Sequence, residues 1–504
     1  MGTEKCPFKR VCSKECLQFY MDSSLKNKAA KGVIWSALER FSVQGIQFVL
    51  GIIIARLVAP SEYGLIAMLN IFLAVAQSFI DSGFSNALIQ KKNRTETDCS
   101  TVFYFNIVVA IGLYSILYVS SPYIAGFYKE PLLETITKWV GINIIVSAFS
   151  IVQRARLSIR LDFKTQAKAS LIAVCCSGII GVSLAYNDFG VWALVIQALL
   201  NNVINTILLW IFARWIPQNT FSYTSFKQLF SFGSKLMLSG FLHVIYANLY
   251  SLVIGRKYSA TDVGYYNRMA SIAQYPSINI VSIITRAIYP IQCSIQDEPE
   301  KLSTTFHQYL RMACYIVFPL MVGLSVIAEP LVKLLLTDKW LPAAHLLSIL
   351  SIAHMWQPVM TINNQVLNVR GRSDYFLKAE IIKKIVAIAI LIVTMPMGLT
   401  SLCIGILAYS FCDMAIIIYY SKKVIQTTYL GQVKEILPIF LLSLFMGGLV
   451  ALITNFIEEA LLQVVAGTLS GIIIVIVFSY LFRIKELEVI CSILKISKCY
   501  KYGK

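Results

Sequence analysis

Long apolar segments recur along almost the whole chain, and no other feature of the sequence restricts its fold as strongly. A helix needs about 20 mainly apolar residues to cross the hydrocarbon core of a bilayer. The chain has 504 residues, of which 57% are hydrophobic and 14% are charged, about half the charged fraction of a soluble protein. We therefore predict an all-α membrane protein with 14 transmembrane helices, near residues 33–55, 64–89, 102–121, 136–153, 169–186, 190–212, 233–254, 264–290, 309–328, 343–368, 377–395, 399–420, 435–456 and 461–482.

The placement of basic residues predicts the orientation of these helices. With the N-terminus in the cytoplasm, the cytoplasmic segments hold 34 of the 44 Lys and Arg residues, and the opposite loops hold seven. Membrane proteins carry such an excess on the cytoplasmic side. We expect a multi-pass protein of the cell (inner) cytoplasmic membrane with both termini in the cytoplasm. The cytoplasmic segments are residues 1–32, 90–100, 154–168, 214–235, 291–311, 370–384, 421–435 and 483–504.

The same placement accounts for the net charge of +18. The charge follows from topology and from attraction to the anionic lipid of the bilayer, so no nucleic acid is needed as a partner. Residues 1–25 lack the apolar stretch of a signal peptide, and we expect a disordered leader there, with Met21 as an alternative start. Cys6, Cys12 and Cys16 match no common metal spacing. A redox or metal site at these three cysteines is the alternative, and no metal or cofactor is otherwise expected.

The chain repeats itself at an offset of about 200 residues. IIARLVAPSEYG at 53–64 aligns without gaps on VIGRKYSATDVG at 253–264, and a second match near offset 210 pairs Arg160 with Arg370. Parallel repeats of this kind enclose substrate sites at their interface. We predict two six-helix lobes in a parallel internal repeat, followed by a C-terminal helix pair. The expected divisions are an N-lobe at 26–215 (helices 1–6), a C-lobe at 216–425 (helices 7–12), helices 13–14 at 426–482 and a cytoplasmic basic tail at 483–504.

Several predicted spans carry charged and polar residues along one helical face. A charge at the bilayer centre costs about 2.5–3.5 kcal/mol on insertion scales, so it must face protein or water. Arg268 and Arg286 lie 18 residues apart, which is five turns and about 27 Å on the same face. We infer a water-filled cleft between the lobes. Its polar lining is predicted to include Gln44 and Gln47 in the first span, Asn70 and Gln77 in the second, His243 and Tyr250 in the seventh, and Tyr275 and Asn279 in the eighth.

The charges in this cleft predict an anionic cargo. Arg40, Arg268 and Arg286 are the candidate substrate-binding residues, because guanidinium binds phosphate and pyrophosphate through two parallel hydrogen bonds. The acidic residues inside spans are candidates for ion coupling or for counter-ions that join helices, and the sequence leaves both roles open. They are Glu39, Asp81 and Asp413.

Six motifs, in this order and spacing, resemble a known family. They are APSEYGLIAM at 59–68, DSGFSNALIQKK at 81–92, QRARLSIRLDFK at 153–164, FGVWALVIQALL at 189–200, KWLPAAHLLSILSIAHMWQP at 339–358 and NVRGRSDYFLKAEIIKK at 368–384. The chain resembles the polysaccharide (O-antigen and capsule repeat-unit) flippases of the multidrug/oligosaccharidyl-lipid/polysaccharide (MOP) exporter superfamily. Within them it is similar to the colanic-acid and teichuronic-acid exporter type.

The resemblance implies a transporter and no catalytic residues. The expected function is to flip undecaprenyl-pyrophosphate-linked oligosaccharide repeat units across the membrane by alternating access, for lipopolysaccharide, capsule or exopolysaccharide biosynthesis. A gradient of H+ or Na+ could drive the cycle. A polysaccharide polymerase and a chain-length regulator are further candidate partners. The alternatives are a multidrug/cation antiporter on the same fold and a membrane glycan polymerase or glycosyltransferase.

Overall fold

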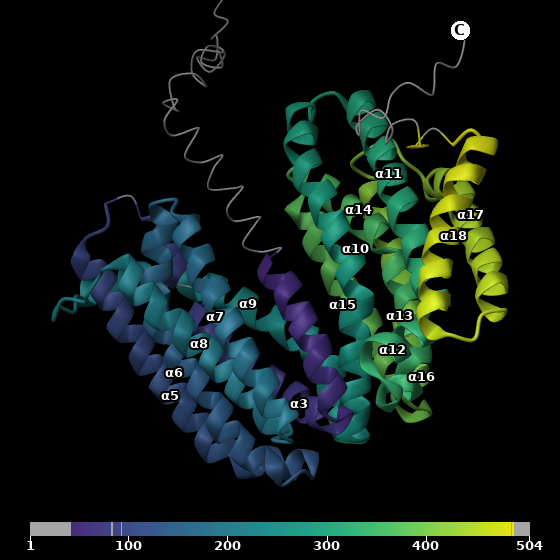
Figure 1. Cartoon of the computed structure of the whole chain (residues 1–504). Helices are drawn as coiled ribbons and strands as arrows, with labels where there is room; N and C mark the ends of the chain where they lie inside the picture. Colours follow the sequence, from purple (N-terminus) through teal and green to yellow (C-terminus); the bar gives the residue numbers. More distant parts are fainter. Residues whose placement is uncertain (1–41, 82–83, 92, 485, 488–504) are drawn as a thin grey trace, which may run out of the picture. The chain divides into compact units, whose positions relative to one another are not determined.

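The structure is a computed structural model that describes residues 42–81, 84–91, 93–484 and 486–487 (Figure 1). The predicted leader with its three cysteines, and the predicted site residues Glu39 and Arg40, lie outside the described residues. Asp81 and His243 belong to described helices, but their side chains are not described.

Helices cover the described part of every predicted span. Three spans are divided, residues 64–89 between α3 and α4, residues 309–328 between α11 and α12, and residues 343–368 between α13 and α14. The helices are Ser42–Leu57, α3 Pro60–Asp81, α4 Phe84–Gln90, α5 Glu96–Tyr128, α6 Leu132–Ile159, α7 Phe163–Tyr186, α8 Val191–Ala213, α9 Tyr223–Lys257, α10 Ala260–Ser294, α11 Pro299–Val326, α12 Ala328–Leu336, α13 Ala344–Met355, α14 Gln357–Val369, α15 Ser373–Thr394, α16 Leu399–Ser421, α17 Tyr429–Asn455 and α18 Ala460–Leu481, with short 3-10 helices at Asp338–Ala343 and Met395–Met397.

Within the described residues, nine helices are long and apolar enough to cross a membrane. They are α3, α5, α6, α7, α8, α11, α16, α17 and α18. The chain is therefore a multi-pass, all-helical membrane protein. The count of 14 crossings stays a prediction, because helix Ser42–Leu57, α13 and α14 are too short by themselves and α9, α10 and α15 carry more polar residues.

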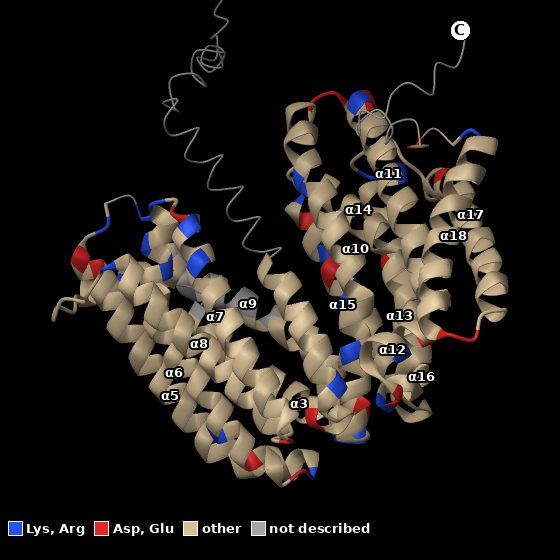
Figure 2. Cartoon of the chain, in the orientation of Figure 1, with Lys and Arg blue, Asp and Glu red and all other residues tan. Residues whose placement is uncertain are grey.

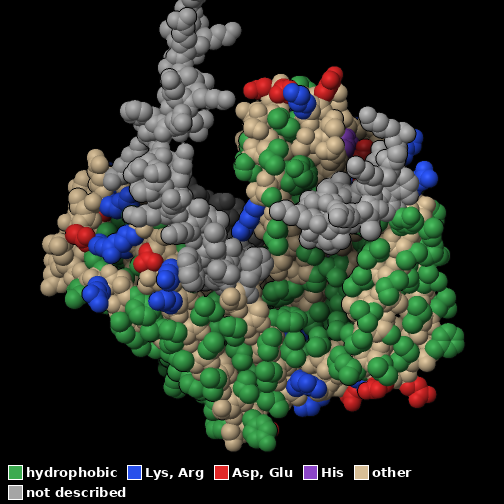
Figure 3. All heavy atoms as spheres, turned by 45° about the horizontal axis from the view of Figure 1, so that its top comes forward, with side chains coloured by type: hydrophobic (Ala, Val, Ile, Leu, Met, Phe, Trp, Pro, Cys, Tyr) green, Lys and Arg blue, Asp and Glu red, His purple; other side chains and the backbone are tan. Residues whose placement is uncertain are grey.

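Large apolar side chains cover the outer surface of the helices. Along α15, Leu377, Ile381, Ile385, Ile388 and Ile392 lie three or four residues apart and are all more than 40% exposed, so they form one face. Figure 3 shows many hydrophobic side chains on the helical surface in view. Such a surface is stable against lipid and not against water.

The described residues form two compact units. The first unit runs up to Val58 and from Leu69 to Leu249, and the second unit comprises Ala59–Met68 and the chain from Tyr250 onward. Helices α3 and α9 therefore each contribute to both units. The predicted lobe boundary between residues 215 and 216 describes the sequence repeat and stays a prediction.

Each unit is a bundle of packed helices. In the first unit α5 packs on α6, and α8 packs on both α6 and α7 (Figure 1). In the second unit α10, α11, α13, α14 and α16 surround a core in which Phe306, Phe318 and Met355 are fully buried. The C-terminal pair α17 and α18 packs on this bundle through α11 and α12.

The repeat at offset 210 folds into the same turn twice. After α6, Leu161 adopts a φ of 55° and the Asp162 N–H donates to Leu157 O at 2.9 Å. After α14, Gly371 adopts a φ of 66° and the Arg372 N–H donates to Leu367 O, also at 2.9 Å. Both are left-handed helix ends that satisfy the last carbonyls of the helix. The two segments matched in sequence therefore end their helices in the same way.

The repeat at offset 200 places α3 and α10 in contact inside the second unit. A Cβ on Gly64 would lie 1.6 Å from Ala260 O, and a Cβ on Gly264 would lie 2.0 Å from Pro60 O. The contact is reciprocal, because each glycine faces the backbone at the start of the other helix. Only a residue without a side chain allows the two backbones to approach this closely.

Charged residues gather at the helix ends in each unit, whereas the helix centres are largely uncharged (Figure 2). In the first unit Glu96 Oε2 lies 2.7 Å from both Arg156 Nη1 and Trp215 Nε1. In the second unit His307 Nδ1 lies 2.8 Å from Glu435 Oε2. Each of these contacts joins segments that the sequence places on the cytoplasmic side, so the predicted alternation of sides agrees with the packing within each unit.

Candidate substrate-binding site

Arg268 is the predicted cationic residue with the most distinctive surroundings. It lies in α10, and its guanidinium carbon is 5.8 Å from the ring centroid of Tyr63, in the part of α3 that belongs to the same unit. Its Nε and Nη2 atoms are buried and have no hydrogen-bond partner among the described residues. The tyrosine face offsets some of the desolvation of the cation. These two N–H groups are hydrogen-bond donors of the kind that an oxygen-rich anion accepts from.

The adjoining stretches of α9 and α10 carry polar and aromatic residues that contact one another. Tyr250, at the end of α9, stacks on Tyr266 with ring centroids 6.3 Å apart. Ser251 Oγ donates to Asn267 Oδ1 at 3.0 Å. Hydroxyls, amides and rings in this arrangement can contact a hydrated headgroup without adding negative charge.

The rest of the predicted stripe continues along α10. Tyr275 and Asn279 are half-buried, and Asn279 Nδ2 donates to Tyr275 O at 2.9 Å. Arg286 is exposed. Arg268 and Arg286 thus both lie in α10, with Pro276 between them.

Asp413 in α16 pairs with Lys383, a residue that the sequence predicts in a cytoplasmic loop. Its Oδ1 lies 2.7 Å from Lys383 Nζ, and the Lys383 side chain is only 3% exposed. Glu380 Oε1 lies 3.4 Å from the same ammonium. Lys383 was counted with the cytoplasmic loop 370–384. In the structure Lys383 lies inside α15, about 15 Å from the start of the helix, and packs against α16.

The predicted polar residues of the first two spans lie in the first unit. Gln44 and Gln47 belong to helix Ser42–Leu57, half-buried and exposed respectively. Asn70 and Gln77 line a cavity of about 390 Å³ together with residues of α6 and α9. The described site residues are thus divided between the two units, and the cleft between lobes stays a prediction.

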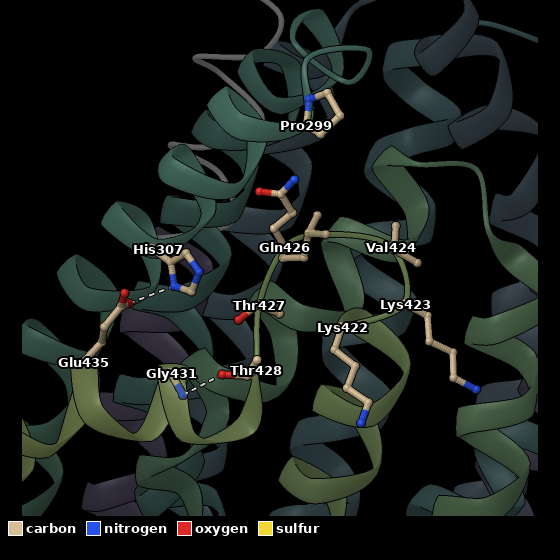
Figure 4. A pocket seen from close by; sticks show the side chains of 11 residues that line it. Pro299, His307, Lys422, Lys423, Val424, Gln426, Thr427, Thr428, Gly431 and Glu435 are labelled. Atoms are coloured by element: carbon tan, nitrogen blue, oxygen red, sulfur yellow. Dashed lines mark hydrogen bonds and ion pairs between the residues drawn. The ribbon is translucent and has the colours of Figure 1, made fainter.

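A larger cavity, of about 640 Å³, contains none of the predicted site residues. It lies in the second unit between α11, the α16–α17 loop and α17, where His307 and Glu435 pair (Figure 4). Its two lysines, Lys422 and Lys423, point away from this pair in Figure 4. The Lys423 ammonium lies 4.2 Å from the ring centroid of Tyr419. Because its cations are held against aromatic rings outside it, this cavity is a poor candidate for the cargo site.

Sequence reasoning missed four residues that the structure brings to these sites. Tyr63 and Lys383 contact predicted residues from other helices, and Asn143 and Asn248 complete the cavity around Asn70. Asn143 and Asn248 could have been found as isolated amides within apolar spans. Tyr63 and Lys383 gave no comparable signal. In the described part of the chain no group of three His, Cys, Asp or Glu side chains could hold a metal ion.

Comparison with known proteins agrees with this architecture. The model of the family described as "Polysaccharide biosynthesis protein" matches residues 53–345, more than half of the chain. The chain belongs to this family, and the predicted resemblance is confirmed.

Two curated relatives are similar over most of their length. The teichuronic acid biosynthesis protein TuaB of Bacillus subtilis is 28% identical over 354 residues, 70% of this chain and 73% of the relative. The lipopolysaccharide biosynthesis protein WzxC of Escherichia coli is 26% identical over 430 residues, 84% of this chain and 86% of the relative.

A solved structure shares the fold. The lipid II flippase MurJ, in an inward closed conformation, superposes with a TM-score of 0.73 at 14% sequence identity, covering 89% of this chain and 98% of that chain. At this identity the likeness concerns the fold alone.

Proposed function

We propose that this protein is a flippase that moves undecaprenyl-pyrophosphate-linked oligosaccharide repeat units across the cytoplasmic membrane for surface polysaccharide biosynthesis. The family places the chain in polysaccharide biosynthesis, and the multi-pass fold is that of a lipid-linked-precursor flippase. The observation that carries the proposal is Arg268, whose buried Nε and Nη2 lack a hydrogen-bond partner among the described residues.

Arg268 supplies what a pyrophosphate needs inside a membrane protein. A guanidinium keeps its charge at every physiological pH and can bind two phosphate oxygens at once. Hydrogen bonds to charged groups contribute about 1.5–3 kcal/mol each, which offsets part of the cost of moving the cargo's charge out of water. The lipid tail remains in the bilayer while the headgroup crosses. Arg286, and Arg40 outside the described residues, are further candidates for the same role.

The two alternatives from the sequence receive less support. A multidrug/cation antiporter would place acidic groups at the cargo site, whereas the candidate site centres on Arg268, whose guanidinium lies against the ring of Tyr63. A glycan polymerase or glycosyltransferase is an enzyme, and TuaB, WzxC and MurJ are not named as enzymes. The transporter reading therefore stands.

The proposal has several further parts. They are alternating access of two lobes, placement in the inner cytoplasmic membrane with cytoplasmic termini, coupling to H+ or Na+, and assembly with a polymerase and a chain-length regulator. The 34 Lys and Arg residues of the predicted cytoplasmic segments support the orientation.

Replacing Arg268 tests the proposal. In cells whose chromosomal gene carries Arg268→Ala, surface polysaccharide should fall at least tenfold, because the pyrophosphate loses charge-assisted hydrogen bonds. Arg268→Lys should restore it only partly, since an ammonium lacks the bidentate geometry. The measurement is quantitative immunoblotting of cell-surface polymer, normalised to the amount of the protein in the membrane.

A matched control removes an exposed charge from the same unit. Lys257→Ala, at the exposed end of α9, should leave the polymer near the wild-type level. Wild-type polymer in the Arg268→Ala strain, with normal amounts of the protein, would contradict the proposal.

A further inference from the structure

The cavity of about 390 Å³ in the first unit has a lining that differs from the surroundings of Arg268. It is formed by α3, α6 and α9, and its residues are Asn70, Leu73, Ala74, Gln77, Asn143, Ile144 and Asn248. Its volume falls within the range of small-molecule sites, about 300–1,000 Å³. None of these residues is charged, and four of the seven carry amides. A ligand of this cavity is therefore neutral and rich in hydrogen-bonding groups.

The side chain of Asn143 accepts a hydrogen bond from another helix, α8. Asn202 Nδ2, in α8, lies 3.2 Å from Asn143 Oδ1, 3.0 Å from Asn143 O and 2.8 Å from Ser147 Oγ. Because the carbonyl oxygen of the Asn143 amide accepts this bond, its nitrogen remains as a donor. Among the described residues, nothing accepts a hydrogen bond from that nitrogen.

Asn248 has the opposite orientation. Its Nδ2 donates to Val244 O of its own helix at 2.9 Å, which leaves the side-chain oxygen as an acceptor. The cavity therefore presents one oriented donor, on Asn143, and one oriented acceptor, on Asn248. A hydroxyl group both donates and accepts, so adjacent hydroxyls on a ring can satisfy both.

Asn70 adds an amide without a hydrogen-bond partner among the described residues. It lies in the middle of a helix that is long and apolar enough to span a membrane, it is exposed, and no hydrogen bond joins it to another described residue. An amide left unpaired against hydrocarbon is costly. Interhelical bonding explains Asn202, but it does not explain Asn70 or the free oxygen of Asn248.

We propose that this amide-lined cavity is the subsite for the sugar rings of the cargo, separate from the arginine that binds its phosphates. The inference rests on the proposed flippase function and extends it. Asn143 and Asn248 contact sugar hydroxyls directly, and Asn202 is a positioning residue that holds the Asn143 amide. The sugar and the pyrophosphate are recognised in different units of the chain, by neutral and by charged groups.

Binding of two probes to the purified full-length protein in nanodiscs separates the two sites. The first probe is free oligosaccharide released by partial acid hydrolysis of the source organism's own surface polysaccharide, and the second is undecaprenyl pyrophosphate. Asn143→Leu and Asn248→Leu should each raise the Kd for the oligosaccharide at least tenfold. The Kd for undecaprenyl pyrophosphate should stay within twofold, and Arg268→Ala should give the reverse pattern.

Asn201→Leu is the matched control, because Asn201 precedes Asn202 in α8 and does not line the cavity. It should change neither Kd, and melting temperatures close to wild type establish that each variant is folded. Wild-type oligosaccharide affinity in both cavity variants would overturn the sugar subsite, as would a wild-type chain that does not bind the oligosaccharide saturably. If the sugar subsite is overturned in this way, loss of undecaprenyl pyrophosphate binding in Arg268→Ala would still support the flippase proposal. Unchanged binding in Arg268→Ala would instead count against the flippase proposal, whatever the cavity variants do.

Discussion

At the scale of single residues, the pair of Lys383 and Asp413 has two possible roles. Both side chains are largely buried, and their charged atoms lie 2.7 Å apart between α15 and α16. The pair can join the two helices, or Asp413 can exchange a proton or Na+ during transport. Removing one partner of a buried ion pair costs about 3–5 kcal/mol, whereas replacing both by apolar residues is often neutral. Stability and transport can therefore be tested separately.

We predict that Asp413→Asn and Lys383→Met each lower the melting temperature of the detergent-purified protein. The double variant with Lys383→Met and Asp413→Leu should recover most of the loss, because no charge is then left unpaired. If Asp413 couples transport to an ion, the double variant should be stable and produce no surface polysaccharide. Recovery of polymer together with stability would assign the pair a purely structural role.

The same residues show the limit of prediction from sequence. Spacing along one helix placed Arg268, Tyr275, Asn279 and Arg286 together, since a helix fixes its own faces. Which side chain of another helix meets them depends on packing between segments far apart in the chain. Tyr63 lies more than 200 residues from Arg268, and periodicity carries no information about that contact.

At the scale of elements, the crossing of α3 and α10 depends on two glycines. A methyl group on Gly64 or Gly264 would meet a backbone carbonyl at 1.6 or 2.0 Å, which no side-chain rotation can relieve. We predict that Gly64→Ala and Gly264→Ala destabilise the protein by at least the upper end of the roughly 1–3 kcal/mol typical of overpacking. Thermal unfolding of the detergent-purified variants, followed by size-exclusion chromatography, measures the effect.

A glycine with free space provides the comparison. Gly112 in α5 has no atom within 4 Å of the position a Cβ would take, apart from the nearby backbone of its own helix. Gly112→Ala should leave stability unchanged or raise it by about 0.5–1 kcal/mol, because alanine loses less backbone entropy in a helix. A Gly64→Ala protein that melts at the wild-type temperature would show that the two helices can separate at little cost.

Apolar runs predicted the helices well, and they missed the breaks within them. The span at 343–368 is continuous in hydrophobicity, yet α13 ends at Met355 and α14 begins at Gln357. Pro358 occupies the first turn of α14, where its missing N–H costs nothing. Hydropathy alone does not register such a break, because the length of the run is still that of one crossing helix.

At the scale of the whole molecule, the sequence predicts which side of the membrane each loop faces. The predicted cytoplasmic loops meet within each unit, as the contacts of Glu96 with Arg156 and of His307 with Glu435 show. Contacts fix which loops share a side. Which of the two sides is cytoplasmic follows only from the excess of Lys and Arg.

Alkaline phosphatase fusions test which side is cytoplasmic, because the enzyme folds to an active form only outside the cytoplasm. We predict high activity for a fusion after Phe456, in the α17–α18 loop, and low activity for a fusion after Thr427, in the α16–α17 loop. Green fluorescent protein at the same two positions should give the reciprocal result. Phosphatase activity at Thr427 and fluorescence at Phe456 would mean that the orientation is inverted.

The assignment of Ala59–Met68 to the second unit, and of α9 up to Leu249 to the first, has a consequence for any attempt to divide the gene. A cut between α8 and α9 would leave each product holding a piece that the other requires. Neither product would contain all the segments of its own unit. Two coexpressed products would have to bind each other's segment before either helix bundle was complete. The division into two compact units therefore does not follow the order of the chain, although the sequence carries a repeat at an offset of about 200 residues.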